Sequence, residues 1–281
     1  MSRVTTLLCL FLLTPLPCLA EDSERKNFSA SQLVAWCIVP FDAKQRGPSE
    51  RAEMLKGLGL RRVAYDWRAE HVPTFEQEIR EYKEHGIEFF AFWSWHDSIE
   101  PLIKKHGIKP QIWMMLRQPV GDTQAAKVAA AAQQLLPHVQ KTRELGLKLG
   151  IYNHGGWSGQ PENMVAVCEF LRLHHQGEHV GIVYNFHHGH EHMANFVRHF
   201  ESMQPLLLCL NLNGMADADS VAGLKNKILP IGSGKHESQM IRHLIDRNYS
   251  GPIGILDHRN ELDTELSLRQ NLEGLSGLLS K

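Results

Sequence analysis

Histidines follow one apolar run of the sequence closely enough to suggest chemistry. Residues 180–192 read VGIVYNFHHGHEH, so a pattern typical of a buried strand is followed by four histidines and a glutamate. Imidazole gains and loses a proton near neutral pH and also binds metal ions. His188 and His192 stand four residues apart, which would place both on one face of a helix, but the segment lacks HExxH spacing. We therefore expect His188 to face a binding site and His190 and His192 to be surface or capping residues.

Two further segments place polar side chains directly after apolar runs. LKLGIYNHGGW (147–157) carries a histidine ahead of two glycines, which let backbone approach a ligand closely. IGILDHRN (253–260) ends another run with an aspartate and a histidine. Imidazole and carboxylate groups in such positions act as general acids and bases. The catalytic candidates are His154, His188, Asp257 and His258.

Aromatic, amide and guanidinium groups follow the other apolar runs. Sugars present C–H faces that pack on tryptophan, and hydroxyl groups that hydrogen-bond to amides, carboxylates and guanidinium groups. The alternative for each residue is structural, because a tryptophan can belong to the core and an arginine can be solvated or paired with a nearby aspartate. The substrate-binding candidates are Asp66, Arg68, Trp93, Trp95, Arg117, Tyr152, Asn153, Trp157, Asn185, Asn211 and Arg259.

Eight continuous apolar runs would position these residues. Each is five to eight residues long, as is typical of parallel strands buried on both faces, and amphipathic helical patterns lie between them. This alternation predicts an α/β fold with a single (β/α)8 TIM barrel over 33–281, whose chemistry lies at the C-terminal ends of the strands. A doubly wound open sheet is the alternative, but no GxGxxG follows the first run. The runs cover 33–39, 61–67, 87–93, 109–116, 147–153, 180–186, 206–213 and 253–257.

The N-terminus has the pattern of a secretory signal peptide over 1–20. Arg3 precedes an apolar run too short to span a bilayer, and the small residue Ala20 precedes two acidic residues. We expect cleavage after Ala20, a polar leader over 21–32, and a periplasmic or secreted protein. No other stretch is apolar and long enough to cross a membrane, so no membrane partner is expected after cleavage.

Charge and cysteine content narrow the possible partners. The formal net charge of −1 and a pI near 7.0 argue against a nucleic-acid partner. Without the first twenty residues, the cysteines are Cys37, Cys168 and Cys209, and their apolar surroundings indicate buried thiols. The expected partner is a small carbohydrate, and the sequence gives no basis for an oligomeric state.

Several segments together resemble the xylose-isomerase-like TIM barrels, the sugar phosphate isomerase/epimerase superfamily. The similarity is carried by LKLGIYNHGGW, VGIVYNFHHGH, LPIGSGKHE (229–237) and GPIGILDHRNELD (251–263). The resemblance implies a divalent metal held by Glu, Asp, His and Glu at the ends of strands five to eight. This sequence has Tyr152, Asn185, Asn211 and Leu256 there. Because these side chains offer no carboxylate to Mg²⁺ or Mn²⁺, we predict no usual family metal.

The resemblance and the candidate residues favour an exported carbohydrate-active enzyme of the sugar isomerase/epimerase type, or a lyase-like one. It would act on an unphosphorylated sugar or keto-sugar, with histidines transferring protons. One alternative is a non-catalytic barrel that binds a sugar or a partner protein. Another is a metal hydrolase whose site uses His154, His188, Asp257 and His258. A glycoside hydrolase would need two facing carboxylates, and Asp257 with either Asp66 or Asp97 are the pairs to consider.

Overall fold

The structure is a computed structural model that describes residues 25–221 and 227–280 of the chain. The predicted signal peptide (1–20) and the first residues of the polar leader lie outside the described residues. Within the described part, no helix has the length and apolar character needed to cross a membrane.

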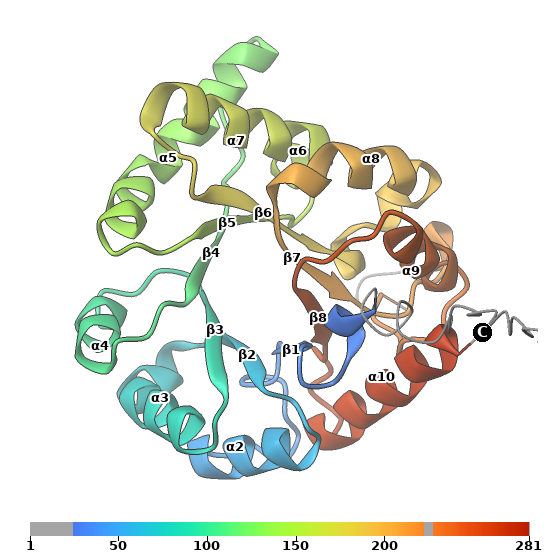
Figure 1. Cartoon of the computed structure of the whole chain (residues 1–281). Helices are drawn as coiled ribbons and strands as arrows, with labels where there is room; N and C mark the ends of the chain where they lie inside the picture. Colours follow the sequence, from blue (N-terminus) through green and yellow to red (C-terminus); the bar gives the residue numbers. More distant parts are fainter. Residues whose placement is uncertain (1–24, 222–226, 281) are drawn as a thin grey trace, which may run out of the picture.

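The described strands form one closed parallel barrel in which each strand pairs with its sequence neighbours and β1 pairs with β8 (Figure 1). All eight strands lie within the predicted apolar runs, so the predicted TIM barrel is confirmed. The strands are β1 (Val34–Trp36), β2 (Arg62–Asp66), β3 (Glu88–Trp93), β4 (Gln111–Met115), β5 (Leu149–Tyr152), β6 (Val180–Asn185), β7 (Leu207–Leu212) and β8 (Ile253–Leu256).

Helices surround the barrel and return the chain from the end of one strand to the start of the next (Figure 1). The α-helices are α2 (Pro48–Gly57), α3 (Phe75–Glu84), α4 (Ile99–His106), α5 (Gln124–Glu144), α6 (Gly156–Gly159), α7 (Pro161–His175), α8 (Phe196–Met203), α9 (Glu237–Asp246) and α10 (Thr264–Leu279). The 3-10 turns are η1 (Lys26–Phe28), η2 (Ala69–Thr74), η3 (Phe186–His188), η4 (His190–Asn195), η5 (Gln204–Leu206) and η6 (Ala218–Ser220).

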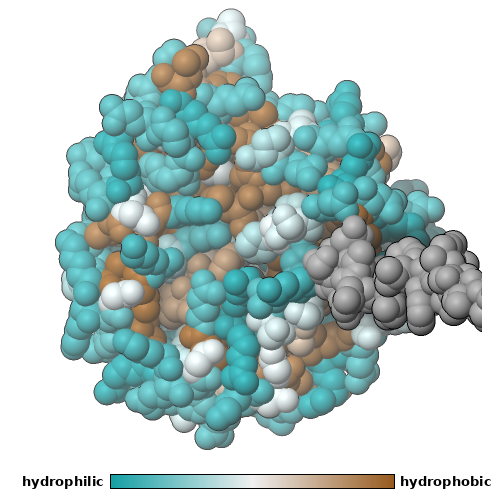
Figure 2. Space-filling model, viewed as in Figure 1, coloured by the Kyte–Doolittle hydropathy of each residue, from teal (hydrophilic) through white to brown (hydrophobic). Residues whose placement is uncertain are grey.

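The strands are buried on both faces, which explains why their sequences are continuously apolar. One set of side chains fills the barrel interior and includes Trp36, Trp113, Tyr152 and Leu256. The alternate set packs outward against the helices, as Tyr184 does. Figure 2 shows polar residues over much of the visible face, with apolar residues gathered between the helices and toward the centre. Packing on two faces fixes the strand register, and with it the residues that emerge at the strand ends.

The histidines after β6 differ from the prediction. His190 and His192 were expected at the surface or as caps, but both are buried. The Nδ1 atom of His192 lies 2.9 Å from the hydroxyl of Tyr184, and its Nε2 atom lies 3.1 Å from Oε1 of Gln160. The expectation was wrong because η3 and η4 turn the chain back over the barrel, so that His192 faces the helix layer.

Candidate active site

A cavity of about 260 Å³ lies at the C-terminal ends of the barrel strands. Every strand except β4 contributes a lining residue from its end or from the segment that follows it. This is the end of a TIM barrel at which catalytic groups are found. The lining residues are Trp36, Cys37, Phe41, Asp66, Arg68, Trp93, Tyr152, His154, His187, His188, Lys227 and His258.

Four histidines from three strand ends meet in this cavity. The ring centroids of His154 and His188 are 4.4 Å apart, and those of His187 and His188 are 3.8 Å apart. The ring of His258 lies 5.8 Å from that of His187. The hydroxyl of Tyr152 lies 3.5 Å from Nε2 of His187. The four histidines, His154, His187, His188 and His258, are called the mouth histidines below.

The mouth histidines are held neutral. Burial, followed by the positive charge of Lys227, lowers the pKa of His188 to about 2 and that of His258 to about 4. Burial also lowers the pKa of His154, and lowers the pKa of His187 to well below its usual range. Desolvation penalises the charged imidazolium, and neighbouring cations add to that penalty. At neutral pH each ring is therefore uncharged, with one N–H group that can donate a hydrogen bond and one ring nitrogen that can accept one.

A single carboxyl group is found among the described lining residues of the cavity, that of Asp66. Its Oδ1 atom accepts a hydrogen bond from the backbone N–H of Val39 at 3.4 Å, and its buried Oδ2 atom has no partner. Burial raises the pKa of Asp66 to about 7. A carboxyl group with that pKa can serve as acid or base near neutral pH. Burial and the adjacent Asp66 also raise the pKa of the Cys37 thiol well above its usual range.

Two lining residues hold unusual backbone conformations. Cys37 has φ of 56° and His258 has φ of 84°, a region that favours glycine. Such conformations persist where surrounding structure enforces them, and they cluster at functional sites. The two residues follow β1 and β8, which are neighbouring strands of the barrel, and both line the same cavity.

The structure places seven of the predicted site residues in the cavity lining. They are the catalytic candidates His154, His188 and His258, and the binding candidates Asp66, Arg68, Trp93 and Tyr152. The fourth catalytic candidate, Asp257, is buried beside the cavity. Its Oδ2 atom accepts a hydrogen bond from Thr264 at 3.0 Å, and its Oδ1 atom lies 3.6 Å from Nε of Arg259. Asp257 thus faces the helix α10 and the loop before it.

The three predicted amide residues contact one another. Asn153 accepts hydrogen bonds from the backbone and side-chain N–H groups of Asn185 at 2.7 and 2.9 Å. Asn211 donates from its side chain to Asn185 at 2.7 Å. A Cβ atom on Gly254 would lie 1.8 Å from Asn211 Oδ1, so the glycine makes room for this amide. These three residues form a buried amide chain that ties β5, β6 and β7 together, and their role in sugar binding stays a prediction.

Four other binding candidates contact structural partners around the rim. Trp95 donates from Nε1 to Asp97 at 3.1 Å, and Trp157 donates from Nε1 to Gln124 at 3.0 Å. Arg259 donates from Nη2 to Ser267 at 2.8 Å. Arg117 is exposed, and its backbone bonds to the side chain of Gln134. The contacts of these four residues with a substrate stay a prediction.

The residues at the four family metal positions do not fit a divalent ion. Two are amides whose oxygens accept hydrogen bonds within the protein, and Tyr152 and Leu256 pack in the barrel interior. Between residues 25 and 280, with 222–226 left aside, no three His, Cys, Asp or Glu side chains are grouped so that they could hold a metal ion. The nearest cation to His188 is instead the protein's own Lys227, whose Nζ atom lies 3.3 Å from Nδ1.

Sequence reasoning did not single out five lining residues, among them Lys227 and Cys37. Lys227 lies after β7, just before the segment LPIGSGKHE (229–237) but outside it, and only its position in a loop at the strand ends could have indicated it. Cys37 looked like an ordinary core thiol, and it is indeed buried. The other three are Trp36, Phe41 and His187.

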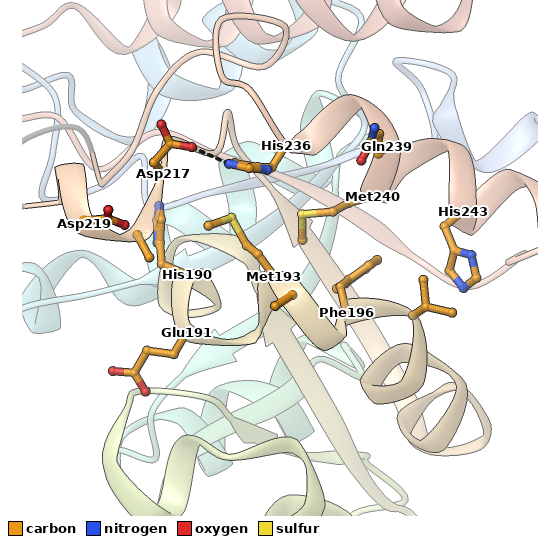
Figure 3. Close-up of a pocket in the computed structure, with 13 residues that line it drawn as sticks. His190, Glu191, Met193, Phe196, Asp217, Asp219, His236, Gln239, Met240 and His243 are labelled. Carbon is orange, nitrogen blue, oxygen red and sulfur yellow. Dashed lines mark hydrogen bonds and ion pairs between the residues drawn. The ribbon is translucent and has the colours of Figure 1, made fainter.

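A second, larger pocket of about 670 Å³ lies outside the barrel mouth, between the η4–α8 segment and the η6–α9 segment (Figure 3). Met193, Phe196 and Met240 supply apolar surface, and Asp217 and His236 are joined at 2.8 Å. Asp217 also pairs with Lys235, and these two hydrogen bonds lower its pKa. Asp217 and His236 of this outer pocket therefore already have charged partners within the protein.

Solved structures share this fold at low sequence identity. The IolI protein with a bound zinc atom aligns with a TM-score of 0.68 and 11% identity, over 88% of this chain and 98% of that chain. The 3-keto-D-glucoside 4-epimerase YcjR from E. coli gives 0.60 and 16%, over 89% and 99%. A xylose isomerase domain containing protein from Salmonella typhimurium LT2 gives 0.62 and 11%, over 90% and 98%. Neither a protein-family model nor a curated protein matches the sequence.

These likenesses confirm the fold that the sequence resemblance implied. The chain has the fold of the xylose isomerase-like TIM barrels and sugar epimerases, with its cavity at the strand ends where enzymes of this fold carry their chemistry.

Proposed function

We propose that the protein is a carbohydrate-active enzyme of the sugar isomerase/epimerase type, acting on an unphosphorylated sugar or keto-sugar. One observation carries the proposal: neutral imidazoles from three strand ends share a small cavity with a carboxyl group whose pKa lies near 7. Proton transfer at carbon needs a group that changes protonation near the working pH, which Asp66 supplies, and hydrogen-bonding groups within reach of the same substrate, which the neutral imidazoles supply. Structures of a keto-glucoside epimerase and a D-psicose 3-epimerase share the fold and support the substrate class.

The side chains suggest how such a reaction would run. One mouth histidine or the Asp66 carboxylate removes the proton next to the substrate carbonyl, and the electron pair moves onto the carbonyl oxygen as an enolate. Lys227 and Arg68 stabilise that negative charge. A second mouth group then returns a proton to the opposite face of the same carbon, giving an epimer. An isomer forms when the hydroxyl proton of that carbon passes to the former carbonyl oxygen and the returned proton goes to the former carbonyl carbon. Protons are conserved, and the reaction needs no external oxidant or reductant.

The proposal also places the protein outside the cytoplasm and its chemistry in its own side chains. The N-terminal pattern over 1–20 motivates export, and phosphorylated sugars are mostly cytoplasmic, so an unphosphorylated substrate is expected. Because the residues at the four family metal positions do not fit a divalent ion, we assign proton transfer to side chains. Mass spectrometry of the secreted or periplasmic protein tests export, because cleavage after Ala20 gives a mature chain that begins at Glu21.

Deuterium exchange tests the reaction. The protein is incubated in D₂O with a panel of keto-sugars, and proton NMR follows loss of the signal next to the carbonyl. We expect exchange with at least one member, and at least a 100-fold slower rate in the His154→Gln/His188→Gln double variant. A protein that binds a panel sugar but exchanges no proton would contradict the proposal and favour the non-catalytic binding barrel.

A further inference from the structure

The charges that line the mouth cavity are unbalanced. Lys227 and Arg68 bring two permanent cations, whereas Asp66 is the one carboxyl group among the described lining residues. Because burial raises the pKa of Asp66 to about 7, much of its negative charge is absent at neutral pH. The neutral mouth histidines add no compensating charge. The cavity therefore carries excess positive charge when it is empty of ligand.

Neither cation is bonded to a carboxylate of the described chain, and the charge interaction of Arg68 with Asp66 only partly offsets the rise that burial causes in the pKa of Asp66. Across residues 25–221 and 227–280, no carboxylate forms an ion pair with Lys227 or Arg68. The Arg68 guanidinium lies 5.3 Å from the ring centroids of both Phe41 and Trp93, and its Nη1 atom donates to the backbone oxygen of Trp67 at 2.8 Å. Lys227 contacts the uncharged His188, and burial lowers its pKa. Buried or half-buried charges are ordinarily paired, so this arrangement leaves a place for an anion.

Two buried arginines elsewhere in the barrel are paired with carboxylates. Arg51 donates to both carboxylate oxygens of Glu78 at 2.7 and 2.8 Å, and Arg46 donates to both oxygens of Asp42 at 2.9 and 3.0 Å. Such bidentate pairs satisfy the guanidinium geometry and charge together. The mouth lacks such a pair although it holds two cations.

We infer that the mouth cavity binds a sugar that carries a single carboxylate, such as a uronic or aldonic acid, with Lys227 and Arg68 facing its negative charge. This inference rests on the proposed function for its sugar class. A carboxylate accepts hydrogen bonds only, which suits the N–H donors of both cations and the buried, unpartnered Nε1–H of Trp93. The cavity volume of about 260 Å³ lies below the usual 300–1,000 Å³ of drug-sized pockets, which favours a monosaccharide.

Calorimetric binding tests the inference without requiring turnover. The whole protein is titrated at low ionic strength with a panel of hexuronates and aldonates, with the neutral parent of each, and with hexose 6-phosphates. We expect at least one carboxylate to bind tenfold or more tightly than its neutral parent, with an affinity that falls as salt is added. Lys227→Met should lower that affinity at least tenfold and leave binding of the neutral parent unchanged. The matched control is Lys235→Met, at the exposed lysine that pairs with Asp217 of the outer pocket, and it should change neither affinity.

Two results would overturn the inference. One is a panel in which no acid binds more tightly than its neutral parent, and the other is tighter binding of the phosphates than of the carboxylates. Different results would contradict the proposed function. Selective carboxylate binding without proton exchange contradicts the reaction and keeps the ligand class. Exchange of a neutral keto-sugar by a protein that binds no acid more tightly than its neutral parent keeps the reaction and contradicts the ligand class.

Discussion

The barrel mouth and the outer pocket differ in how their polar groups are satisfied. The outer pocket is more than twice as large, about 670 against 260 Å³, but Asp217 there is already bonded to Lys235 and His236. In the mouth, the carboxyl oxygen Asp66 Oδ2 and Nδ1 of both His187 and His258 are buried without partners, whereas the unpartnered buried atoms of the outer pocket are Nε2 of His190 and of His243. Buried polar groups in folded proteins are nearly always hydrogen-bonded, and exceptions call for a functional explanation.

The comparison shows that volume alone does not select the site of the proposed function. The ion pairs of the outer pocket are exposed, and such pairs contribute little to stability. The mouth desolvates its titratable groups, which raises the pKa of Asp66 to about 7 and keeps His188 uncharged at neutral pH. We therefore assign the proposed function to the smaller of the two pockets.

Replacing one histidine in each pocket gives the largest expected contrast. His188→Gln removes a mouth imidazole and should slow proton exchange at least 100-fold. His236→Gln makes the same change in the outer pocket and should leave the rate within about twofold, since His236 does not line the cavity. The rates are measured by NMR in D₂O. Equal losses in the two variants would show that the mouth is not the reacting site.

The buried amide chain of Asn153, Asn185 and Asn211 allows a test of which polar groups near the mouth contribute to stability. Asn211→Leu keeps the branched shape and the number of heavy atoms of the side chain but leaves the Oδ1 atom of Asn185 without its donor. We expect urea unfolding to show a loss of about 1–3 kcal/mol, the cost of one unsatisfied buried polar group. His188→Gln, at the partly open mouth, should lose less. The assignment of Asn211 to structure is contradicted if its replacement abolishes sugar binding while stability is unchanged.

Acidification should also distinguish the pockets. The pKa of His188 is lowered from 6.5 to about 2 in the folded protein, so between these values the unfolded chain binds a proton that the folded chain does not. The contribution of this group to the free energy of unfolding has its full value above pH 6.5. It falls as the pH decreases, by about 2 kcal/mol at pH 5. Asp66 and Asp257, with raised pKa values, act in the opposite direction over part of this range.

The variants isolate the contribution of His188. The loss of stability between pH 7 and pH 5, measured by urea unfolding, should be about 2 kcal/mol smaller in His188→Gln than in the wild-type protein. His236→Gln serves as the control, and its pH dependence should follow the wild-type protein. Identical pH dependence in all three would mean that His188 is not held neutral.

The sequence predicted the barrel well because continuous apolar runs and helix signals are local. Each of the eight strands appears where its run was found. It also placed His154, His188 and His258 at strand ends, where they converge in one cavity.

Asp257 follows the same strand as His258 but lies one residue earlier, and alternation along the strand sends its side chain to the helix layer. Lys227 depends on the path of a long loop after β7, which carries no periodic signal. The burial of His190 and His192 depends on the 3-10 turns after β6, which sequence periodicity did not indicate.

Direct titration of the imidazoles by heteronuclear NMR tests the central claim that the mouth histidines are held neutral in one shared cavity. With assignments from single variants, the signals of His188 and His258 should remain those of neutral rings from pH 8 down to about 5, because their pKa values are lowered to about 2 and about 4. Addition of a bound carboxylate sugar should move their signals together. Titration of both rings near the ordinary value of about 6.5 would contradict the account.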